Sequence, residues 1–307
     1  MVTVLLIRKI VELFLIMLLG YAIVKSKIIQ AKESSVLSKL SLYLVVPCVI
    51  INSFQIEFTE NVKNGLLLAF SVAVAIHFLL IAMAFLAGKF FHADEVEKAS
   101  IIYSNAGSLV IPIVAAVLGD EWVIYSSAFV TVQMVFVWTH GKILFSKGSK
   151  PSFRKIILNV NMISIIVGLL LMLLGIRLPS LVNETMASVG NMIGPIGMLI
   201  TGMVVAGMGL KQLFLHKRVY LVALLRMIVC PGIILLLLKW SHISSLIPGG
   251  TEILLISFLA AAAPAAATVT QFAQIHNKDA EYASAINIIT TLSCIVTMPA
   301  FVALYYV

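Results

Sequence analysis

The sequence predicts an all-α membrane protein, and three observations predict this fold class: an apolar composition, apolar runs of about twenty residues, and basic residues between those runs. Of the 307 residues, 61% are hydrophobic and 11% are charged, and the mean hydropathy is +1.11. A soluble domain is about half apolar and about a quarter charged, so a soluble fold could not cover this much apolar surface. Backbone groups in lipid must be paired internally, and apolar runs without ten-residue alternation favour helices over a closed barrel.

We expect about ten transmembrane helices. Their predicted ranges are 4–24, 35–54, 64–88, 98–119, 122–145, 156–175, 182–208, 218–238, 252–275 and 281–306. The first range has no small-residue cleavage pattern and is followed by Lys25 and Lys27, so we interpret it as a span and not as a signal peptide. Cys48, Cys230 and Cys294 all lie within spans and lack metal-ligand spacing, which argues against a zinc site or a disulfide framework.

The basic residues predict the orientation of the chain. The net charge is +8, but the Lys and Arg residues lie in short connections, where they set topology and do not indicate nucleic-acid binding. Odd-numbered connections carry Lys25, Lys27, Lys32, Lys89, Lys98, Lys142, Lys147, Lys150, Arg154, Lys155, Lys211, Lys217, Arg218 and Lys278. The N-terminus and the even-numbered connections carry only Arg8, Lys9, Lys63, Arg177 and Lys239. We therefore expect a multi-pass protein of the cell membrane with both termini outside.

The longest basic connection, KGSKPSFRK at 147–155, separates five predicted spans from five. An odd number of spans in each half gives the halves opposite orientations, which is typical of an inverted repeat. Three internal echoes occur in order, in corresponding spans: Pro47 and Pro195, Pro112 and Pro264, and YSSA at 125–128 with YASA at 282–285. The sequence therefore predicts two inverted five-helix repeats.

The fourth span (98–119) and the ninth span (252–275) each contain a proline near mid-membrane, Pro112 and Pro264. Proline removes a backbone donor and interrupts the helix, and broken spans in corresponding positions of inverted halves indicate a binding site. The half-helix after each proline would direct its free N–H groups and positive dipole end into that site. A carboxylate would bind there with Asn105 as an uncharged donor. The alternative is that both prolines merely kink packed helices.

Other polar residues leave two interpretations open. His77, near the centre of the third span, either couples transport to protons or ions or forms an interhelical hydrogen bond. Arg226, in the eighth span, either snorkels to the interface or pairs inside the bundle. The stretch 190–209 is rich in small residues at helical spacing, which favours tight helix packing over ligand binding. No Walker, HExxH or Ser-His-Asp motif occurs, so we expect neither an enzyme nor a cofactor or metal.

Several segments form a recognisable series along the chain. They are GYAIVKSKII (20–29), LYLVVPCVIINSF (42–54), SNAGSLVIPIVAAVLG (104–119), VQMVFVWT (132–139), NVNMISIIVGLLLMLLGIRLPSLV (159–182), RMIVCPGI (226–233), AAAPAAATVTQFA (261–273) and a final span with Pro299. In this order the segments resemble the auxin efflux carrier family, which includes bacterial permeases for malonate and malate. The resemblance covers nearly the whole chain.

The resemblance implies ten spans in two inverted repeats, with the fourth and ninth spans crossing at Pro112 and Pro264. It also implies a dimeric scaffold and a transport domain that moves like an elevator. The implied division is scaffold helices 1–2 at 1–60, transport-domain helices 3–5 at 61–146, a cytoplasmic loop at 147–155, scaffold helices 6–7 at 156–210 and transport-domain helices 8–10 at 211–307. Carried over by position, the substrate-lining residues are Val46, Asn105, Asn161 and Ala267.

Two departures from the family pattern bear on the substrate. Plant members carry a glutamine where this chain has Ala265, and the chain lacks their long central loop, so the bacterial carboxylate permeases are the nearer model. We expect a secondary transporter of small organic anions that forms a homodimer through the second or seventh span. The alternatives are a symporter of another solute coupled to sodium or protons, and a non-transporting membrane receptor.

Overall fold

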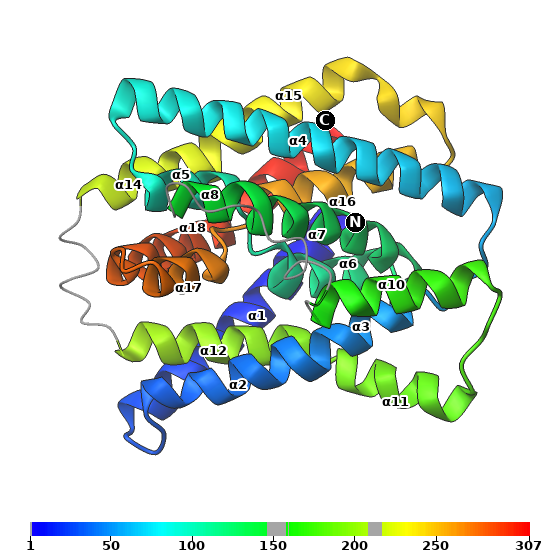
Figure 1. The fold of residues 1–307 in the computed structure, drawn as a ribbon, viewed down its shortest axis with the longest axis horizontal. Coiled ribbons are helices and arrows are strands. Elements are labelled where there is room, and N and C mark those ends of the chain that lie inside the picture. The colour runs from blue at the N-terminus through cyan, green and yellow to red at the C-terminus, as the bar shows by residue number, and fades with distance from the viewer. Residues whose placement is uncertain (1, 146–157, 159, 208–216) are drawn as a thin grey trace.

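The computed structural model of the chain describes residues 2–145, 158, 160–207 and 217–307, and these residues are mostly helical (Figure 1). The α-helices of this part are α1 (Val2–Lys25), α2 (Ser34–Leu40), α3 (Val46–Ser53), α4 (Glu60–Phe91), α5 (Glu95–Ile102), α6 (Ile111–Val117), α7 (Val123–Phe136), α8 (Lys142–Phe145), α10 (Val160–Leu173), α11 (Ser180–Gly190), α12 (Ile193–Gly207), α14 (Lys217–Leu224), α15 (Cys230–Ser241), α16 (Gly250–Ala262), α17 (Ala267–Ile275) and α18 (Ala280–Tyr306). The all-α membrane class is confirmed. The basic connection at 147–155 lies outside the described residues.

Six helices in the described part are long and apolar enough to cross a membrane. They are Ala31–Ser53, Glu60–Phe91, Val123–Phe145, Ser180–Gly207, Lys217–Ser241 and Ala280–Tyr306. Val160–Leu173 and Gly250–Ala262 are shorter apolar helices. Helical residues occupy each of the ten predicted ranges, but the number of ten crossings stays a prediction.

A wide π-helical turn precedes a proline at three places. The turns Ser41–Val45, Ala106–Val110 and Leu225–Val229 lead directly into α3, α6 and α15, and each of these helices has a proline near its first residue. Proline lacks an N–H group and its ring crowds the carbonyl one turn earlier. A π-turn widens the backbone at that point, so the chain passes the proline without leaving the helix. These prolines are therefore compatible with continuous helical winding.

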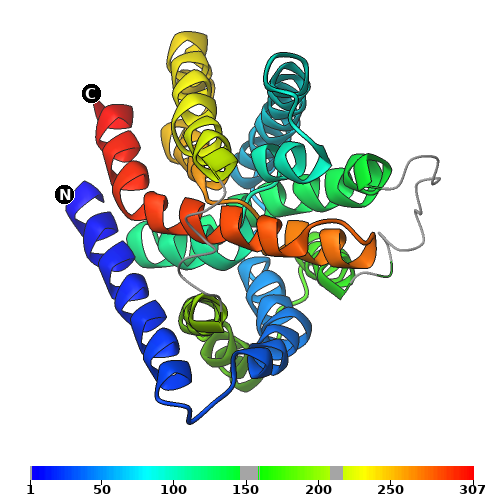
Figure 2. The same cartoon turned by 90° about the vertical axis from the view of Figure 1, so that its left-hand side faces the viewer.

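The helices form two groups, which Figures 1 and 2 show from two directions. In one group, α1 packs along α12, and α3 packs against α10 and α11. In the other, α4 packs against α5, α7 and α16, while α18 packs against α14 and α17. The first group comes from the spans assigned to the scaffold and the second from those assigned to the transport domain. The functional division itself stays a prediction.

Small residues bring α1 and α12 into backbone contact. A Cβ atom added at Gly202 would collide with the Met17 carbonyl oxygen, and one added at Gly20 would collide with the Leu199 carbonyl oxygen. Only glycine permits such an approach between two helices. The described part of the stretch 190–209 thus serves tight packing inside one chain, as predicted. Gly202 is therefore used within the chain and gives no support to the homodimer expectation.

At two opposite ends of the bundle, polar contacts join the connections between the predicted spans to one another. At one end, Arg218 of α14 pairs with Glu97 of α5, and Lys278 pairs with Glu95, so the third, seventh and ninth connections meet. At the other end, Arg177 donates a hydrogen bond to the Gln55 carbonyl oxygen, which joins the sixth and second connections. The connections joined at the first end are odd-numbered and those joined at the second end are even-numbered, while the alternation of all ten spans stays a prediction.

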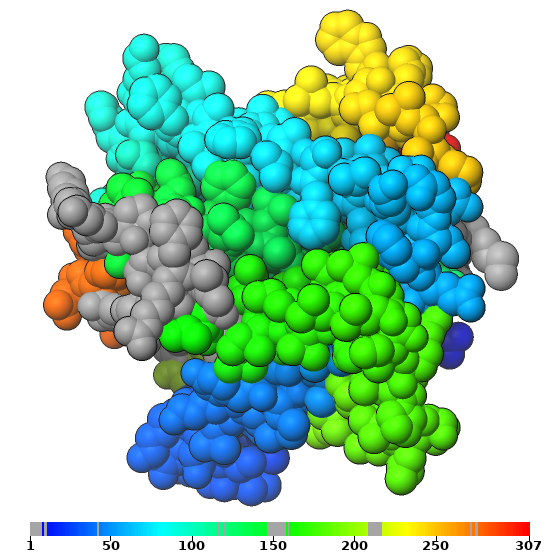
Figure 3. Space-filling model, turned by 45° about the vertical axis from the view of Figure 1, so that its right-hand side comes forward, coloured from blue at the N-terminus to red at the C-terminus, as the bar shows by residue number. Residues whose placement is uncertain are grey.

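The face shown in Figure 3 is formed largely by α4, by α10 and α11, and by α2 and α3. Helices α4 and α10 expose large apolar side chains, among them Phe78 and Phe85 of α4 and Ile163 and Leu170 of α10. An exposed apolar surface of this kind would be unstable in water and is expected where helices contact lipid.

Candidate functional site

Two helices are interrupted deep in the protein, and their interruptions are joined. Helix α5 ends at Ile102 and α16 ends at Ala262, and each is followed by a short extended segment. The two segments run antiparallel and form an isolated β-bridge between Ser104 and Ala265. We call the paired segments Tyr103–Asn105 and Ala263–Ala266 the crossover.

Backbone hydrogen bonds hold the crossover together. The Asn105 N–H donates to the Pro264 carbonyl oxygen at 2.8 Å, and the Ala266 N–H donates to the Tyr103 carbonyl oxygen at 3.0 Å. Buried backbone groups must find partners, and extended residues have none within their own segment. Each broken span therefore supplies the partners that the other one lacks.

Side chains from neighbouring helices pair the remaining backbone groups of the bridge. Gln133 of α7 accepts from the Ser104 N–H at 3.0 Å and donates to the Ser104 carbonyl oxygen at 2.8 Å. On the opposite edge, Thr290 of α18 accepts from the Ala265 N–H at 3.1 Å, and Asn287 donates to the Ala265 carbonyl oxygen at 2.5 Å. The fifth and tenth predicted spans thus each supply side chains that pair the backbone groups on one edge of the bridge.

A buried arginine caps the two helices that enter the crossover. Arg226 has no exposed side-chain surface. Its Nη1 donates to the Ile101 carbonyl oxygen at 2.8 Å, and its Nε and Nη2 donate to the Ala263 carbonyl oxygen at 3.1 and 2.8 Å. Of the two interpretations left open by the sequence, snorkelling is wrong, because Arg226 is bound inside the bundle.

The helices that leave the crossover begin with unpaired donors. The first N–H groups of any helix have no intrahelical acceptor, and together with the helix dipole they attract anions. Beside one of these starts, the side chain of Asn105 is half-buried and makes no hydrogen bond to another described residue. A Cβ atom added at Gly107 would meet nothing within 4 Å, so open space adjoins this helix start. The arrangement offers donors and room to a small anion.

The two prolines predicted to form the crossover have different positions. Pro264 lies in the extended segment and accepts the hydrogen bond from Asn105. The expectation for Pro112 is wrong in position, since Pro112 is the second residue of α6 and follows a π-turn instead of a break. The π-turn accommodates the missing N–H group, and the actual break lies at Tyr103–Asn105.

The structure distributes the four predicted substrate-lining residues over two places. Asn105 follows Ser104 of the bridge, and Ala267, the first residue of α17, lies two residues after Ala265, so both adjoin the crossover. Val46 begins α3, and Asn161 is 3% exposed near the start of α10, a helix that packs against α3. The crossover pair adjoins the helix starts described above, while the placement of all four around one substrate stays a prediction.

His77 is packed among aromatic rings. It has no exposed surface, its ring stacks on Phe136 at 5.2 Å between centroids, and its Nδ1 lies 2.7 Å from the Ala73 carbonyl oxygen. A carbonyl oxygen only accepts, so Nδ1 carries a proton. A role for His77 in ion coupling stays a prediction, which uptake by His77→Gln under an imposed pH gradient would test.

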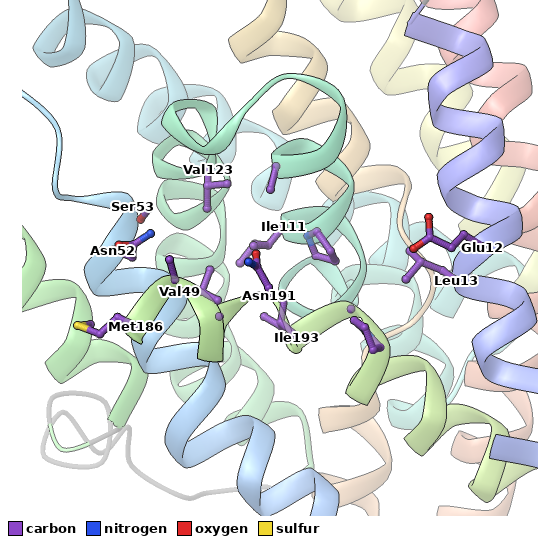
Figure 4. Close-up of a pocket in the computed structure, with 16 residues that line it drawn as sticks. Glu12, Leu13, Val49, Asn52, Ser53, Ile111, Val123, Met186, Asn191 and Ile193 are labelled. Carbon is purple, nitrogen blue, oxygen red and sulfur yellow. The ribbon is translucent and has the colours of Figure 1, made fainter. Parts of the chain in front are cut away.

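A cavity of about 360 Å³ lies between the two helix groups (Figure 4). Its polar lining residues are Glu12, Asn52, Ser53 and Asn191. Helices α1, α3, α11 and α12 line it from one group, and α6 and α7 line it from the other. Pro112 lines this cavity, but Val46, Asn105, Asn161 and Ala267 do not. The volume is in the range of small-molecule sites, and the cavity separates the helix groups that would move against each other.

Sequence reasoning missed the roles of Gln133, Asn287 and Thr290 in pairing the bridge. Each is a polar residue inside an apolar span, which marks a functional or structural role in general but does not identify its partner. For Gln133 the partner lies 29 residues away in the chain. The pairing of Gln133 with Ser104 could have been inferred only from the position of the break in the fourth span, and Pro112 indicated a wrong position for that break.

Comparison with known proteins agrees with this architecture. A family model described as membrane transport protein matches residues 5–152 and 149–302, which together cover nearly the whole chain. No match to a curated protein was found. Broken helices that meet in the interior of an apolar bundle are typical of secondary transporters. The chain therefore belongs to the membrane transport protein family, that of the auxin efflux carriers, whose members are transporters and not enzymes.

Proposed function

We propose that this protein is a secondary transporter of small organic anions, and of carboxylates in particular. The observation that carries the proposal is the crossover, from which two helices start with free N–H groups beside the Asn105 amide. These donors attract an anion without a lysine or arginine in contact with it. A site in which no Lys or Arg side chain contacts the anion suits a carrier, because a direct ion pair at mid-membrane would hold the anion and slow its release.

The pairing of the bridge supports an inverted repeat. Gln133 belongs to the last predicted span of the first half, and Asn287 and Thr290 belong to the last predicted span of the second half. Each satisfies the backbone of the broken span in its own half. This correspondence is expected if the two halves have the same fold in opposite orientation.

We propose an elevator-type movement of the second helix group along the first. The cavity already separates parts of the two groups. A polar contact that joins them elsewhere is long: the hydroxyl oxygens of Ser53 of α3 and Ser127 of α7 lie 3.4 Å apart. Contacts of this strength can be exchanged as one group slides past the other.

For the assembly we propose a homodimer through the scaffold group. Helix α2 and the turn after it expose Val36, Leu40 and Tyr43, which recur at helical spacing on one face. Such a face is available to lipid or to a second copy of the chain. The mass of the protein–detergent complex by light scattering tests this proposal, and a monomeric mass in detergent and in lipid nanodiscs would contradict it.

The proposed orientation in the cell membrane has both termini outside. Glu184 is an exposed residue of α11 near the sixth connection, which is predicted to face outside. Lys217 is an exposed residue of α14 near the seventh connection, which is predicted to face the cytoplasm. In whole cells, an impermeant thiol reagent should label Glu184→Cys and should leave Lys217→Cys unlabelled until the membrane is opened. The reverse pattern would invert the topology.

Uptake into proteoliposomes tests the proposed function. Radiolabelled malonate, malate and indole-3-acetate are offered separately, with and without sodium and pH gradients. We expect saturable uptake of at least one carboxylate that requires the protein. If no carboxylate enters at a saturable rate while the protein is folded and oriented, the transport proposal fails and a receptor becomes the better interpretation.

A further inference from the structure

Arg226 carries a charge that no carboxylate neutralises in the described part of the chain. The ion pairs there join Lys63 to Glu60, Arg218 to Glu97 and Lys278 to Glu95, and none includes Arg226. A guanidinium stays protonated in proteins, so a full positive charge lies buried next to the crossover. Burying an unpaired charge is costly, and its retention calls for an explanation.

The partners of Arg226 provide that explanation. It binds the carbonyl oxygens of Ile101 and Ala263, which lie at the C-terminal ends of α5 and α16. The C-terminal end of a helix carries roughly half a negative charge, so two such ends together carry roughly one. The charge of Arg226 is therefore opposite to that of the two helix ends it binds and about equal to it in size.

The helices that leave the crossover have positive N-terminal ends, and no acidic residue on these helices neutralises them. No acidic residue occurs between 98 and 119 or between 253 and 278. Without Arg226, the four helix ends at the crossover would sum to about zero, because two positive ends would oppose two negative ones. With Arg226, the crossover keeps a net charge of about +1.

We infer that Arg226 sets the charge selectivity of the crossover. With Arg226 present, the crossover binds one carboxylate group. Without Arg226, it would not prefer an anion over a neutral molecule. The inference rests on the proposed function, since it concerns the same site. Arg226 does not touch the anion; it is a positioning residue that acts through the helix ends it caps.

Two groups of variants separate charge from structure. Cys230 is buried one turn after Arg226 in the chain, at the first residue of α15. Cys230→Asp introduces a negative charge there, while Cys230→Asn adds a side chain of the same size without charge. Arg226→Lys keeps the positive charge with fewer hydrogen bonds, and Arg226→Gln keeps a donor without the charge. Cys230→Asp and Cys230→Asn differ in charge at nearly the same size, and Arg226→Lys and Arg226→Gln differ in charge while both keep a hydrogen-bond donor.

The measurement is the ratio of affinities for malonate over malonamide, and for indole-3-acetate over indole-3-acetamide, with purified protein. One unit of charge about 10 Å from the anion, in an effective dielectric of about 20, changes affinity on the order of tenfold. We expect this ratio to fall about tenfold in Cys230→Asp and Arg226→Gln, and to be kept in Cys230→Asn and Arg226→Lys. A purely structural role would lower both affinities alike and leave the ratio unchanged.

The outcomes also separate this inference from the proposed function. If the wild type binds neither carboxylate, the proposed function fails and the inference falls with it. If the wild type binds a carboxylate and the folded Cys230→Asp and Arg226→Gln variants keep the wild-type ratio, only the role of Arg226 is overturned. Equal loss of the ratio in Cys230→Asp and Cys230→Asn would likewise overturn it, because size and not charge would then be the cause.

Discussion

Replacing Gln133 by leucine should destabilise the protein more than the removal of any comparable surface polar group. Gln133 is 8% exposed and makes three hydrogen bonds to Ser104: it accepts from the backbone N–H at 3.0 Å and from the hydroxyl at 2.7 Å, and it donates to the carbonyl oxygen at 2.8 Å. Leucine has a similar size but no donor or acceptor. The substitution therefore leaves the Ser104 backbone without partners in a buried place.

The magnitude follows from the number of groups left unpaired. A buried backbone donor or acceptor without a partner costs about 1–3 kcal/mol. The N–H and carbonyl groups of Ser104 together then cost about 2–6 kcal/mol, while the hydroxyl of Ser104 can rotate to another acceptor. Folded proteins are commonly stable by only about 5–15 kcal/mol, so the lower end of this range already lowers the melting temperature by several degrees.

The assay is thermal unfolding of the purified protein in detergent, followed by tryptophan fluorescence. Thr131→Val is the matched control, because Thr131 lies on the same helix and, among the described residues, its hydroxyl donates to the Ser127 carbonyl oxygen of that helix. Gln133→Glu provides a second comparison, since it keeps the acceptors and loses the donor to Ser104. Gln133→Leu and Thr131→Val melting at the same temperature would refute the reasoning about the bridge.

Two further predictions concern helix packing and movement. Gly202→Leu should abolish or strongly reduce the yield of folded protein, because the leucine side chain would collide with the Met17 backbone. Gly232→Leu should keep the yield, because a Cβ atom there meets nothing within 4 Å. Gel filtration compares the folded yield of the two variants. A disulfide formed between Ser53→Cys and Ser127→Cys, with the native cysteines replaced by alanine, should stop uptake until a reductant is added, since it links the two helix groups; undiminished uptake by the cross-linked protein would exclude the sliding movement.

The sequence was sufficient to predict the fold class and the approximate ranges of the helices. Apolar runs report local burial in lipid, and each predicted range contains helix in the structure. The proline of the ninth span also marked its break correctly, because Pro264 lies in the extended segment. These features depend on residues that are close in the chain.

The break in the fourth span could not be located in the same way. Its position depends on the Ala265 segment with which Ser104 pairs and on the Gln133 side chain, and neither is adjacent in the chain. Pro112 misled the prediction, because a π-turn absorbs its missing N–H group. Arg226 gave a similar ambiguity, since a lone basic residue two turns inside a span does not reveal whether it reaches the interface or a buried carbonyl group.

The affinity of Asn105→Ala for a transported carboxylate tests the central claim, that the anion binds at the crossover, most directly. Titration calorimetry would compare it with the wild type and with Asn61→Ala, an exposed asparagine in the first turn of α4. A hydrogen bond to a charged acceptor is worth about 1.5–3 kcal/mol, so we predict that Asn105→Ala binds about tenfold to a hundredfold more weakly while Asn61→Ala is unchanged. Wild-type affinity in Asn105→Ala would contradict the placement of the anion at the crossover.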